Sequence, residues 1–195
     1  MPLALKYPIR PFILTIFLAF GSQSPAMAGE LFFGKDDGWV LFQGPILTEE
    51  MDEILSQLED KKPKLILLNS IGGNVLGALQ FARYVRQNQM NTWIAENQTC
   101  ASACALVFLA GIQRFSEGKL VVHQYLPPAE QANEKIARDA AWISVQRIIG
   151  ETITLLNSFD TPRFVFERIF SSPDLYEFTE AEMAKVTTVT SLDEM

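Results

Sequence analysis

The sequence predicts an α/β protein built from strand–helix–strand units, and three observations support this prediction. Strand-like and helix-like segments alternate from residue 39 to 125, residues 65–68 are apolar at every position, and paired glycines follow at Gly72 and Gly73. A strand that is apolar on both faces is typical of the centre of a parallel sheet, and the alternation is typical of βαβ units. The chain has 195 residues, of which 48% are hydrophobic and 20% charged, as expected for one globular domain.

Each element of this alternation carries a local signal. Thr48 can cap a helix whose apolar residues follow the i, i+3, i+4, i+7 pattern of one buried face. The glycine pair turns the chain into a second helix, and Gly111 ends a third. The expected strands are residues 39–42, 65–68, 92–95 and 120–123, and the expected helices are residues 51–58, 75–85 and 103–110.

The rest of the chain is expected to be mainly helical. Residues 129–157 predict a long helix or a helix pair, a further helix follows Pro162, and residues 186–189 predict a last strand. No repeat, low-complexity segment or long linker interrupts the sequence, so we expect one domain. It would cover residues 29–195, with a core at 38–125 and a helical and C-terminal part at 129–190.

The first 28 residues have the pattern of a secretory signal peptide. Lys6 and Arg10 precede an apolar run, and the segment ends in Ala26-Met27-Ala28. The run is short for a membrane-spanning helix, which needs about 20 apolar residues. We therefore expect cleavage after Ala28 and a periplasmic or secreted protein, and an uncleaved leader that anchors the chain to a membrane is the alternative.

Composition argues against several classes of function. The net charge is −7 and no basic stripe is present, so a nucleic-acid partner is not expected. One histidine and two cysteines argue against the usual His/Cys metal sites, and we expect neither a metal nor a cofactor.

Three features could carry chemistry, and they follow one another along the expected fold. The glycines Gly72 and Gly73 can offer free N–H groups to an oxyanion, although a plain tight turn has the same pattern. Ser102 lies between alanines at the start of a helix, where a serine can be a cap or a nucleophile. His123, the only histidine, ends a strand and can be a general base or a structural residue; Lys119 is the other possible base.

Cys100 and Cys104 flank Ser102 in the sequence. In an exported protein a disulfide between them would persist. Their short separation requires a turn or irregular backbone for such a bond, and two buried thiols are the alternative.

The order of these motifs resembles a known family. The chain contains, in order, Ser70-Ile71-Gly72-Gly73, Ala101-Ser102-Ala103 and Val122-His123-Gln124. On these motifs it resembles the ClpP/crotonase superfamily, and most closely the periplasmic ClpP-like serine proteases. The similarity covers about residues 38–125 and continues more weakly through 129–190. It implies a ClpP/crotonase-like spiral of βαβ units, followed by a long helix and a C-terminal α/β tail.

The resemblance also implies a role for each motif. Ser102 would be the nucleophile and His123 its general base. The N–H groups of Gly73 and Ala103 would form the oxyanion hole, with Gly72 shaping the turn. Cytosolic ClpP lacks the flanking cysteines, and a bridge between them could fix the turn of an exported protein.

The third catalytic residue is the main departure from the family pattern. If Thr179 opens the last helix, the family's aspartate falls on Ser171. Asp174 is the nearest aspartate and our candidate for the catalytic acid. Weaker candidates are Asp160, Glu167 and Asp139. Ile71 replaces the family's usual proline, which is a second departure.

These observations favour an exported serine hydrolase, with a peptidase that acts on a peptide or protein through an acyl-enzyme as the leading hypothesis. The alternatives are a catalytically impaired binding or scaffold protein of the cell envelope, and an esterase or thioester hydrolase of crotonase type. The helix at 136–157 could mediate a homo-oligomer or simply cover the sheet. Trp142, Phe164, Phe166 and Phe170 are expected in the core, and Leu126-Pro127-Pro128 is expected to border the substrate channel.

Overall fold

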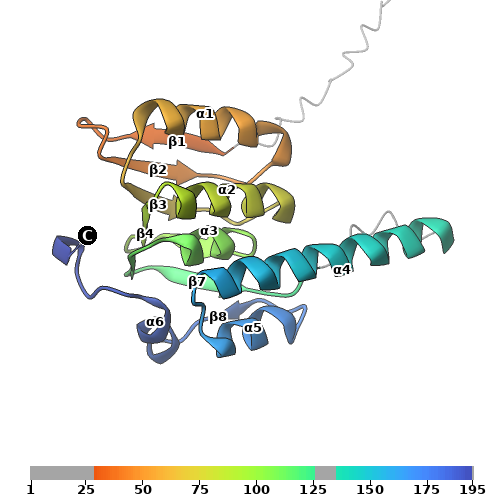
Figure 1. The fold of residues 1–195 in the computed structure, drawn as a ribbon. Helices are drawn as coiled ribbons and strands as arrows, with labels where there is room; N and C mark the ends of the chain where they lie inside the picture. The colour runs from red at the N-terminus through yellow and green to blue at the C-terminus, as the bar shows by residue number, and fades with distance from the viewer. Residues whose placement is uncertain (1–28, 126–134, 195) are drawn as a thin grey trace, which may run out of the picture.

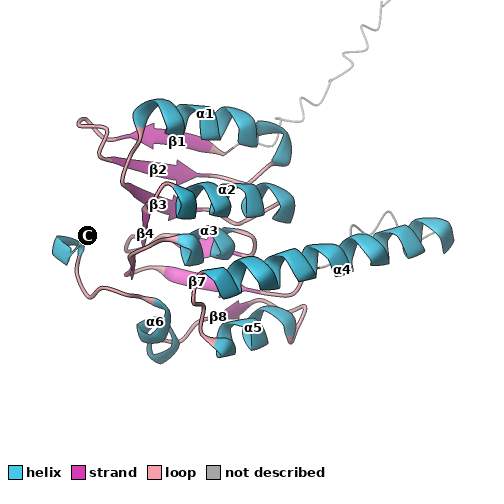
Figure 2. Cartoon of the chain, viewed as in Figure 1, coloured by secondary structure: helices cyan, strands magenta, loops and turns pink. Residues whose placement is uncertain are grey.

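The computed structural model describes residues 29–125 and 135–194 as a mixed α/β structure. The described chain contains two mixed sheets and six α-helices, and Figure 2 shows how helices and strands alternate through it. The predicted leader, residues 1–28, and the segment 126–128 lie outside the described residues. The expected α/β class is therefore confirmed at this level.

The larger sheet has five strands in the order β1-β2-β3-β4-β6. Only β1 runs antiparallel to its neighbour, and the other strands are parallel. The strand predicted to be central is central, because β3 pairs with β2 on one side and β4 on the other. The strands are β1 (Glu30–Phe33), β2 (Trp39–Gln43), β3 (Leu65–Asn69), β4 (Asn91–Ile94) and β6 (Arg114–Ser116).

The smaller sheet has three strands in the order β5-β7-β8. The first pair is parallel and the second antiparallel. Its members are β5 (Thr99–Ala101), β7 (Lys119–Val122) and β8 (Tyr176–Glu177). An isolated bridge between Ser70 and Cys100 joins the end of β3 to β5, so the two sheets meet at this point.

The helices connect the strands and then form the C-terminal part. They are α1 (Met51–Lys61), α2 (Val75–Gln87), α3 (Cys104–Ala110), α4 (Lys135–Ser158), α5 (Arg163–Phe170) and α6 (Glu180–Val186). Figure 1 shows β1 to β4 in succession with α1 and α2 beside them, while α4 extends beyond the rest of the described chain.

The core lies between the larger sheet and the helices packed on it. Val40 and Phe42 of β2 are buried and stand in register with Ile66 and Leu68 of β3. Alternate residues of a strand share one face, so these four side chains form a continuous apolar surface. All seven residues of α3 are buried, which places the start of this helix deep inside the molecule.

Several expectations about local structure are wrong. Residues 186–189 do not form a strand, because a capping box between Thr179 and Glu182 starts α6 and the helix continues to Val186. Val186 and Val189 are buried without strand pairing. Thr48 opens a short 3-10 turn instead of capping α1 directly.

The long helix α4 is buried along one stripe only. Val145, Ile148 and Leu156 are buried at the spacing of one helical face. Trp142 and Ile143 are 62% and 69% exposed, so the expectation that Trp142 belongs to the core is wrong. The helix therefore covers neighbouring elements and also presents apolar side chains to solvent.

Candidate functional site

Ser102 lies on a sharp turn between β5 and α3, and its backbone is held in an unusual conformation. Its φ is +55°, a region that residues other than glycine seldom occupy. Its N–H donates to the carbonyl of Val121 at 2.8 Å, and its carbonyl accepts from the N–H of Ala105 at 3.0 Å. A strained serine between a strand and a helix has the geometry of a nucleophile turn.

The cysteines on either side of Ser102 form a disulfide. The Cα atoms of Cys100 and Cys104 are 5.3 Å apart because the chain reverses at Ser102. This separation lies in the usual range for a disulfide. Both half-cystines are fully buried. The predicted disulfide is confirmed, and it is compatible with an oxidising compartment outside the cytoplasm.

The glycine turn packs directly against the Ser102 turn. Gly72 and Gly73 have φ values of +85° and +142°. A Cβ atom on Gly72 would lie 2.5 Å from the carbonyl oxygen of Ala101 and 2.8 Å from the nitrogen of Ala103. Only glycine allows this contact without displacing one of the two turns.

Backbone hydrogen bonds hold the two turns in register. The N–H of Ser70 donates to the carbonyl of Thr99, and the N–H of Ala101 donates to the carbonyl of Ser70, each at 2.8 Å. The N–H of Gly72 donates to the hydroxyl of Ser70 at 3.0 Å, so this N–H is already engaged. Gly72 therefore shapes the turn, as the resemblance implies.

Backbone N–H groups without a partner in the described chain lie beside Ser102 in the pocket. Those of Gly73 and Ala103 donate to no described residue, and both residues line the same pocket as Ser102. Unpaired N–H groups beside a serine hydroxyl can stabilise an oxyanion. The arrangement agrees with the expected role of these two residues, which stays a prediction.

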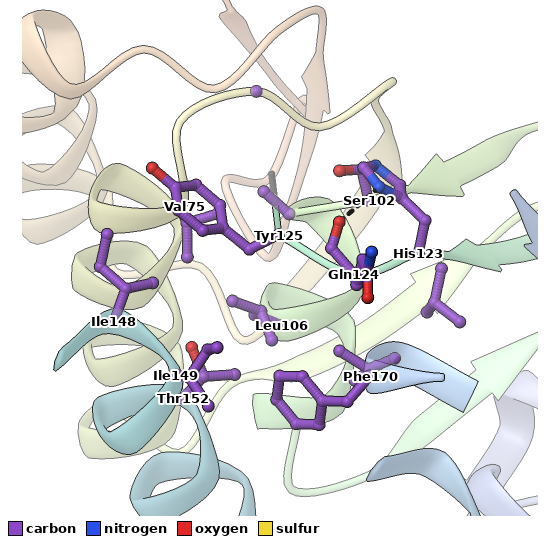
Figure 3. A pocket seen from close by; sticks show the side chains of 14 residues that line it. Val75, Ser102, Leu106, His123, Gln124, Tyr125, Ile148, Ile149, Thr152 and Phe170 are labelled. Atoms are coloured by element: carbon purple, nitrogen blue, oxygen red, sulfur yellow. Dashed lines mark hydrogen bonds between the residues drawn. The ribbon is translucent and has the colours of Figure 1, made fainter. Parts of the chain in front are cut away.

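His123 follows β7 and lies in the same pocket, with its side chain half-buried. Its Nδ1 lies 2.8 Å from the carbonyl oxygen of Gln124. If Nδ1 carries the proton and donates it there, Nε2 is left as the acceptor nitrogen. Figure 3 shows Ser102 and His123 on the same side of the pocket. No hydrogen bond joins these two described side chains, and such contacts often tighten only when substrate binds.

Asp174 makes no hydrogen bond or ion pair with His123 in the described structure. The exposed Asp174 carboxylate accepts from the hydroxyl of Ser172 at 3.3 Å, and that hydroxyl accepts from the N–H of Asp174. The carbonyl of Ser172 accepts from the N–H of Gln124 at 2.9 Å, which brings this segment beside the residue after His123. The role of Asp174 as the catalytic acid stays a prediction.

The other candidate acids and the alternative base lie away from the pocket. Glu167 pairs with Arg163, and Lys119 pairs with Glu177 on the surface. Neither Asp139 nor Asp160 lines the pocket, and no described lining residue is an aspartate, glutamate, lysine or arginine. His123 is therefore the one base candidate that shares the pocket with Ser102.

The pocket itself has a volume of about 170 Å³ and mainly apolar walls. Helix α4 contributes Ile148, Ile149 and Thr152, which Figure 3 labels together with Phe170 of α5. Helix α5 also contributes Ile169. An apolar cavity of about 150 Å³ holds a benzene ring, so this pocket has room for one substrate side chain. Phe170, expected purely in the core, lies on its wall.

The residues from α4 and α5 are the part of the site that the sequence analysis missed. They are more than forty positions from Ser102, and nothing in their spacing connects them to the three motifs. One available signal was Thr152, a polar residue in the otherwise apolar stripe of a long helix. A buried polar residue on an apolar face is a more informative observation than an exposed apolar one.

Comparisons with known proteins do not assign the chain to a family. No protein-family model matches it, and no curated protein is similar to it at a significant level. Among the helices that the structure describes, none is long and apolar enough to cross a membrane.

Proposed function

We propose that this chain is an exported serine hydrolase of the ClpP/crotonase type that cleaves peptides through an acyl-enzyme. One observation carries the proposal: the Ser102 hydroxyl, the unpaired N–H groups of Gly73 and Ala103, and the His123 ring line one pocket. The family's spiral of βαβ units is part of the proposal, and the parallel strands β2, β3, β4 and β6 support it.

The proposed chemistry begins with attack of Ser102 Oγ on a substrate carbonyl carbon. The serine proton passes to Nε2 of His123, and the C=O electron pair moves to the oxygen. The resulting oxyanion accepts hydrogen bonds from the N–H groups of Gly73 and Ala103. Loss of one such donor typically costs about 100- to 1,000-fold in turnover.

The acyl-enzyme then forms and is hydrolysed. The C–N bond breaks, its electron pair stays on nitrogen, and His123 returns the proton to the leaving amine. Water next attacks the acyl-Ser102 ester, again losing its proton to His123, and the acid is released as Ser102 regains its proton. The fixed backbone turn at Ser102 supports the role of nucleophile, because the Ser102 hydroxyl oxygen need not be repositioned before it attacks the substrate.

In this proposal a main-chain carbonyl orients His123, the general base. A hydrogen bond from Nδ1 of His123 to the Gln124 carbonyl, at 2.8 Å, would select the tautomer with a free Nε2. The absence of a carboxylate from the described pocket lining favours the second candidate function, a catalytically impaired binding or scaffold protein. In that case the pocket would bind a peptide without cleaving it.

Export and assembly are further parts of the proposal. The buried disulfide and the leader pattern support a periplasmic or secreted location. The exposed Trp142 and Ile143 on the projecting helix support a homo-oligomer. The double variant Trp142→Ser/Ile143→Ser should then lower the molar mass found by light scattering, and an unchanged mass argues against an interface at this face.

The decisive experiment is labelling of the purified mature protein with a fluorophosphonate serine probe. Peptide mass spectrometry should find the label on Ser102 in the wild type and not in Ser102→Ala. The label should be strongly reduced in His123→Ala. Ser144→Ala, on the exposed face of α4, is the matched control and should label like the wild type.

The same preparation separates the alternatives. Faster turnover of peptides than of simple esters supports a peptidase, and the reverse supports an esterase. A folded wild-type protein that takes no label at Ser102 contradicts the hydrolase proposal and favours a binding or scaffold protein.

A further inference from the structure

Thr152 is a polar residue in the buried stripe of α4. Val145, Ile148 and Leu156 occupy the same stripe and are apolar, whereas Thr152 is only 4% exposed and lines the pocket beside Ser102. Figure 3 shows it next to Ile149 on the wall that α4 gives to the pocket. A buried polar group normally has a hydrogen-bond partner, so a hydroxyl at this place calls for an explanation.

The Thr152 hydroxyl makes no hydrogen bond to any described residue. Thr154, on the exposed side of the same helix, donates its hydroxyl to the carbonyl four residues earlier, at Gly150, over 2.8 Å. Thr187 does the same with the carbonyl of Met183. This backbone contact is the usual way in which a helical threonine satisfies its hydroxyl, and Thr152 does not use it.

The unpaired hydroxyl is also not sealed inside the protein. The fully enclosed side-chain atoms without a partner in the described chain are Trp93 Nε1 and Thr161 Oγ1, and Thr152 Oγ1 is not one of them. Thr152 lines the pocket, so its side chain borders this open space. A group that enters the pocket can reach this hydroxyl.

We propose that the Thr152 hydroxyl makes the pocket beside Ser102 select an uncharged substrate side chain that ends in a hydrogen-bonding atom, such as glutamine or tyrosine. This inference rests on the proposed function and names the substrate class of that site. The pocket volume of about 170 Å³ suits one such side chain. A hydroxyl both donates and accepts, so it can pair with an amide or a phenol.

The walls of this pocket also disfavour charged substrate side chains. The described lining contains no aspartate, glutamate, lysine or arginine, and most of it is apolar. An ion moved from water into such a pocket would lose its hydration without gaining a counter-charge. A purely apolar side chain would fit but would leave the Thr152 hydroxyl unpaired, which lowers its relative affinity.

The test compares matched peptides that differ only in the residue whose carbonyl is attacked. The pairs are glutamine against leucine and tyrosine against phenylalanine. In the wild type, kcat/KM should favour the polar member of at least one pair. Thr152→Val, which keeps the shape and removes the hydroxyl, should lower that ratio about 10-fold, the effect of one net hydrogen bond.

Two further variants separate hydrogen bonding from a change in structure. Thr152→Ser retains a hydroxyl and should keep most of the preference for the polar side chain. Thr154→Val is the matched control, since its hydroxyl bonds the helix backbone, and it should leave the ratio unchanged. The proposal is overturned if Thr152→Val and the wild type give the same ratio in both pairs, or if the wild type prefers the apolar member of both.

A binding measurement keeps this test separate from the test of catalysis. Calorimetric titration of Ser102→Ala with the same peptides should show tighter binding of the polar member, and Ser102→Ala/Thr152→Val should lose that difference. If wild-type Ser102 takes no label while this binding preference is present, the hydrolase proposal fails and the Thr152 assignment stands. If no peptide binds to Ser102→Ala, the Thr152 assignment fails.

Discussion

The two halves of the candidate site are held in place in different ways. On the Ser102 side, the backbone is fixed by hydrogen bonds to Val121 and Ala105, by the Cys100–Cys104 disulfide and by contact with Gly72. On the His123 side, the ring is half-buried, and the one hydrogen bond it makes to the described chain is with the carbonyl of the next residue, Gln124.

The difference follows the backbone conformation that each half adopts. Ser102 occupies a backbone conformation that costs about 1–3 kcal/mol in isolation. A residue keeps such a conformation only where several surrounding interactions hold it in place. His123 directly follows the ordinary strand β7 and is not among the residues with positive φ. Under the proposed function, the nucleophile and the oxyanion site would be organised before binding, and the base would reach its final position with substrate.

The largest effect is expected for a variant that disturbs the packing between the Gly72 turn and the Ser102 turn. Gly72→Ala should lower the rate of Ser102 acylation about 1,000-fold, as for loss of an oxyanion donor. The reason is that the new Cβ would lie 2.5 Å from the carbonyl oxygen of Ala101, so the turns must separate. The rate of fluorophosphonate labelling measures this effect.

Gly150→Ala is the matched control for that variant. A Cβ there meets no atom within 4 Å, and alanine favours the helix over glycine by about 1 kcal/mol. This variant should label normally and unfold at a slightly higher temperature. Normal labelling of Gly72→Ala would contradict the idea that the two turns depend on each other.

The second prediction concerns the disulfide between Cys100 and Cys104, the two cysteines that flank Ser102 in the sequence. Cys100→Ala/Cys104→Ala should lower the free energy of unfolding by about 2 kcal/mol, because the bridge closes a short loop. Acylation should fall about 10-fold in the folded protein, since part of the support for the Ser102 conformation is lost. Urea unfolding and labelling rates measure the two effects separately.

Val85→Ala is a control that lowers stability without touching the pocket, because Val85 is buried in α2 and is not a lining residue. Its acylation rate should stay close to that of the wild type. If the cysteine variant also acylates at the wild-type rate, the bridge stabilises the fold and does not position the nucleophile.

The third prediction tests how the His123 side is anchored. Burial alone would raise the pKa of Glu182, but hydrogen bonds from Thr179, Tyr176 and Arg168 lower it from 4.5 to about 2. A depressed folded pKa gives stability that is present above about pH 4.5 and is lost as the pH falls toward 2. Because β8 pairs with β7, acid should loosen the strand that leads to His123.

Unfolding free energies measured from pH 7 to pH 3 check this effect. Glu182→Gln should be less stable at pH 7 and should depend less on pH than the wild type. Glu180→Gln, an exposed neighbour in the first turn of α6, should behave like the wild type. Equal pH dependence in the wild type and Glu182→Gln would show that this carboxylate does not anchor the region.

The smallest expected effect concerns the catalytic acid. Loss of an orienting aspartate in a complete triad costs about 10⁴ in turnover. Asp174 is exposed and bonds only Ser172 among the described residues, so we expect Asp174→Asn to reduce kcat/KM by less than about 10-fold. A loss near 10⁴ would instead assign Asp174 to a triad that forms when substrate binds.

Sequence reasoning was most successful where local chemistry decides the structure. The apolar run at residues 65–68 predicted the central strand, and the apolar run at residues 103–110 predicted the helix that follows Ser102. It failed at residues 186–189, where the valines suggested a strand but Val186 is the last residue of α6 and the residues after it form no strand. A single sequence shows which residues prefer burial, but not the partner against which they are buried.

The sequence by itself determined the alternation of β2, α1, β3, α2, β4, α3 and β7, the Gly-Gly and Ser102 motifs, and the candidate base, because these depend on residue types and short spacings. Only the tertiary structure decided that the N–H groups of Gly73 and Ala103 have no partner among the described residues, and that Thr152 lies in the same pocket as Ser102. The placement of Thr152 depends on how α4 packs against α2 and α3. That packing reflects the summed burial of many side chains, which no local pattern records.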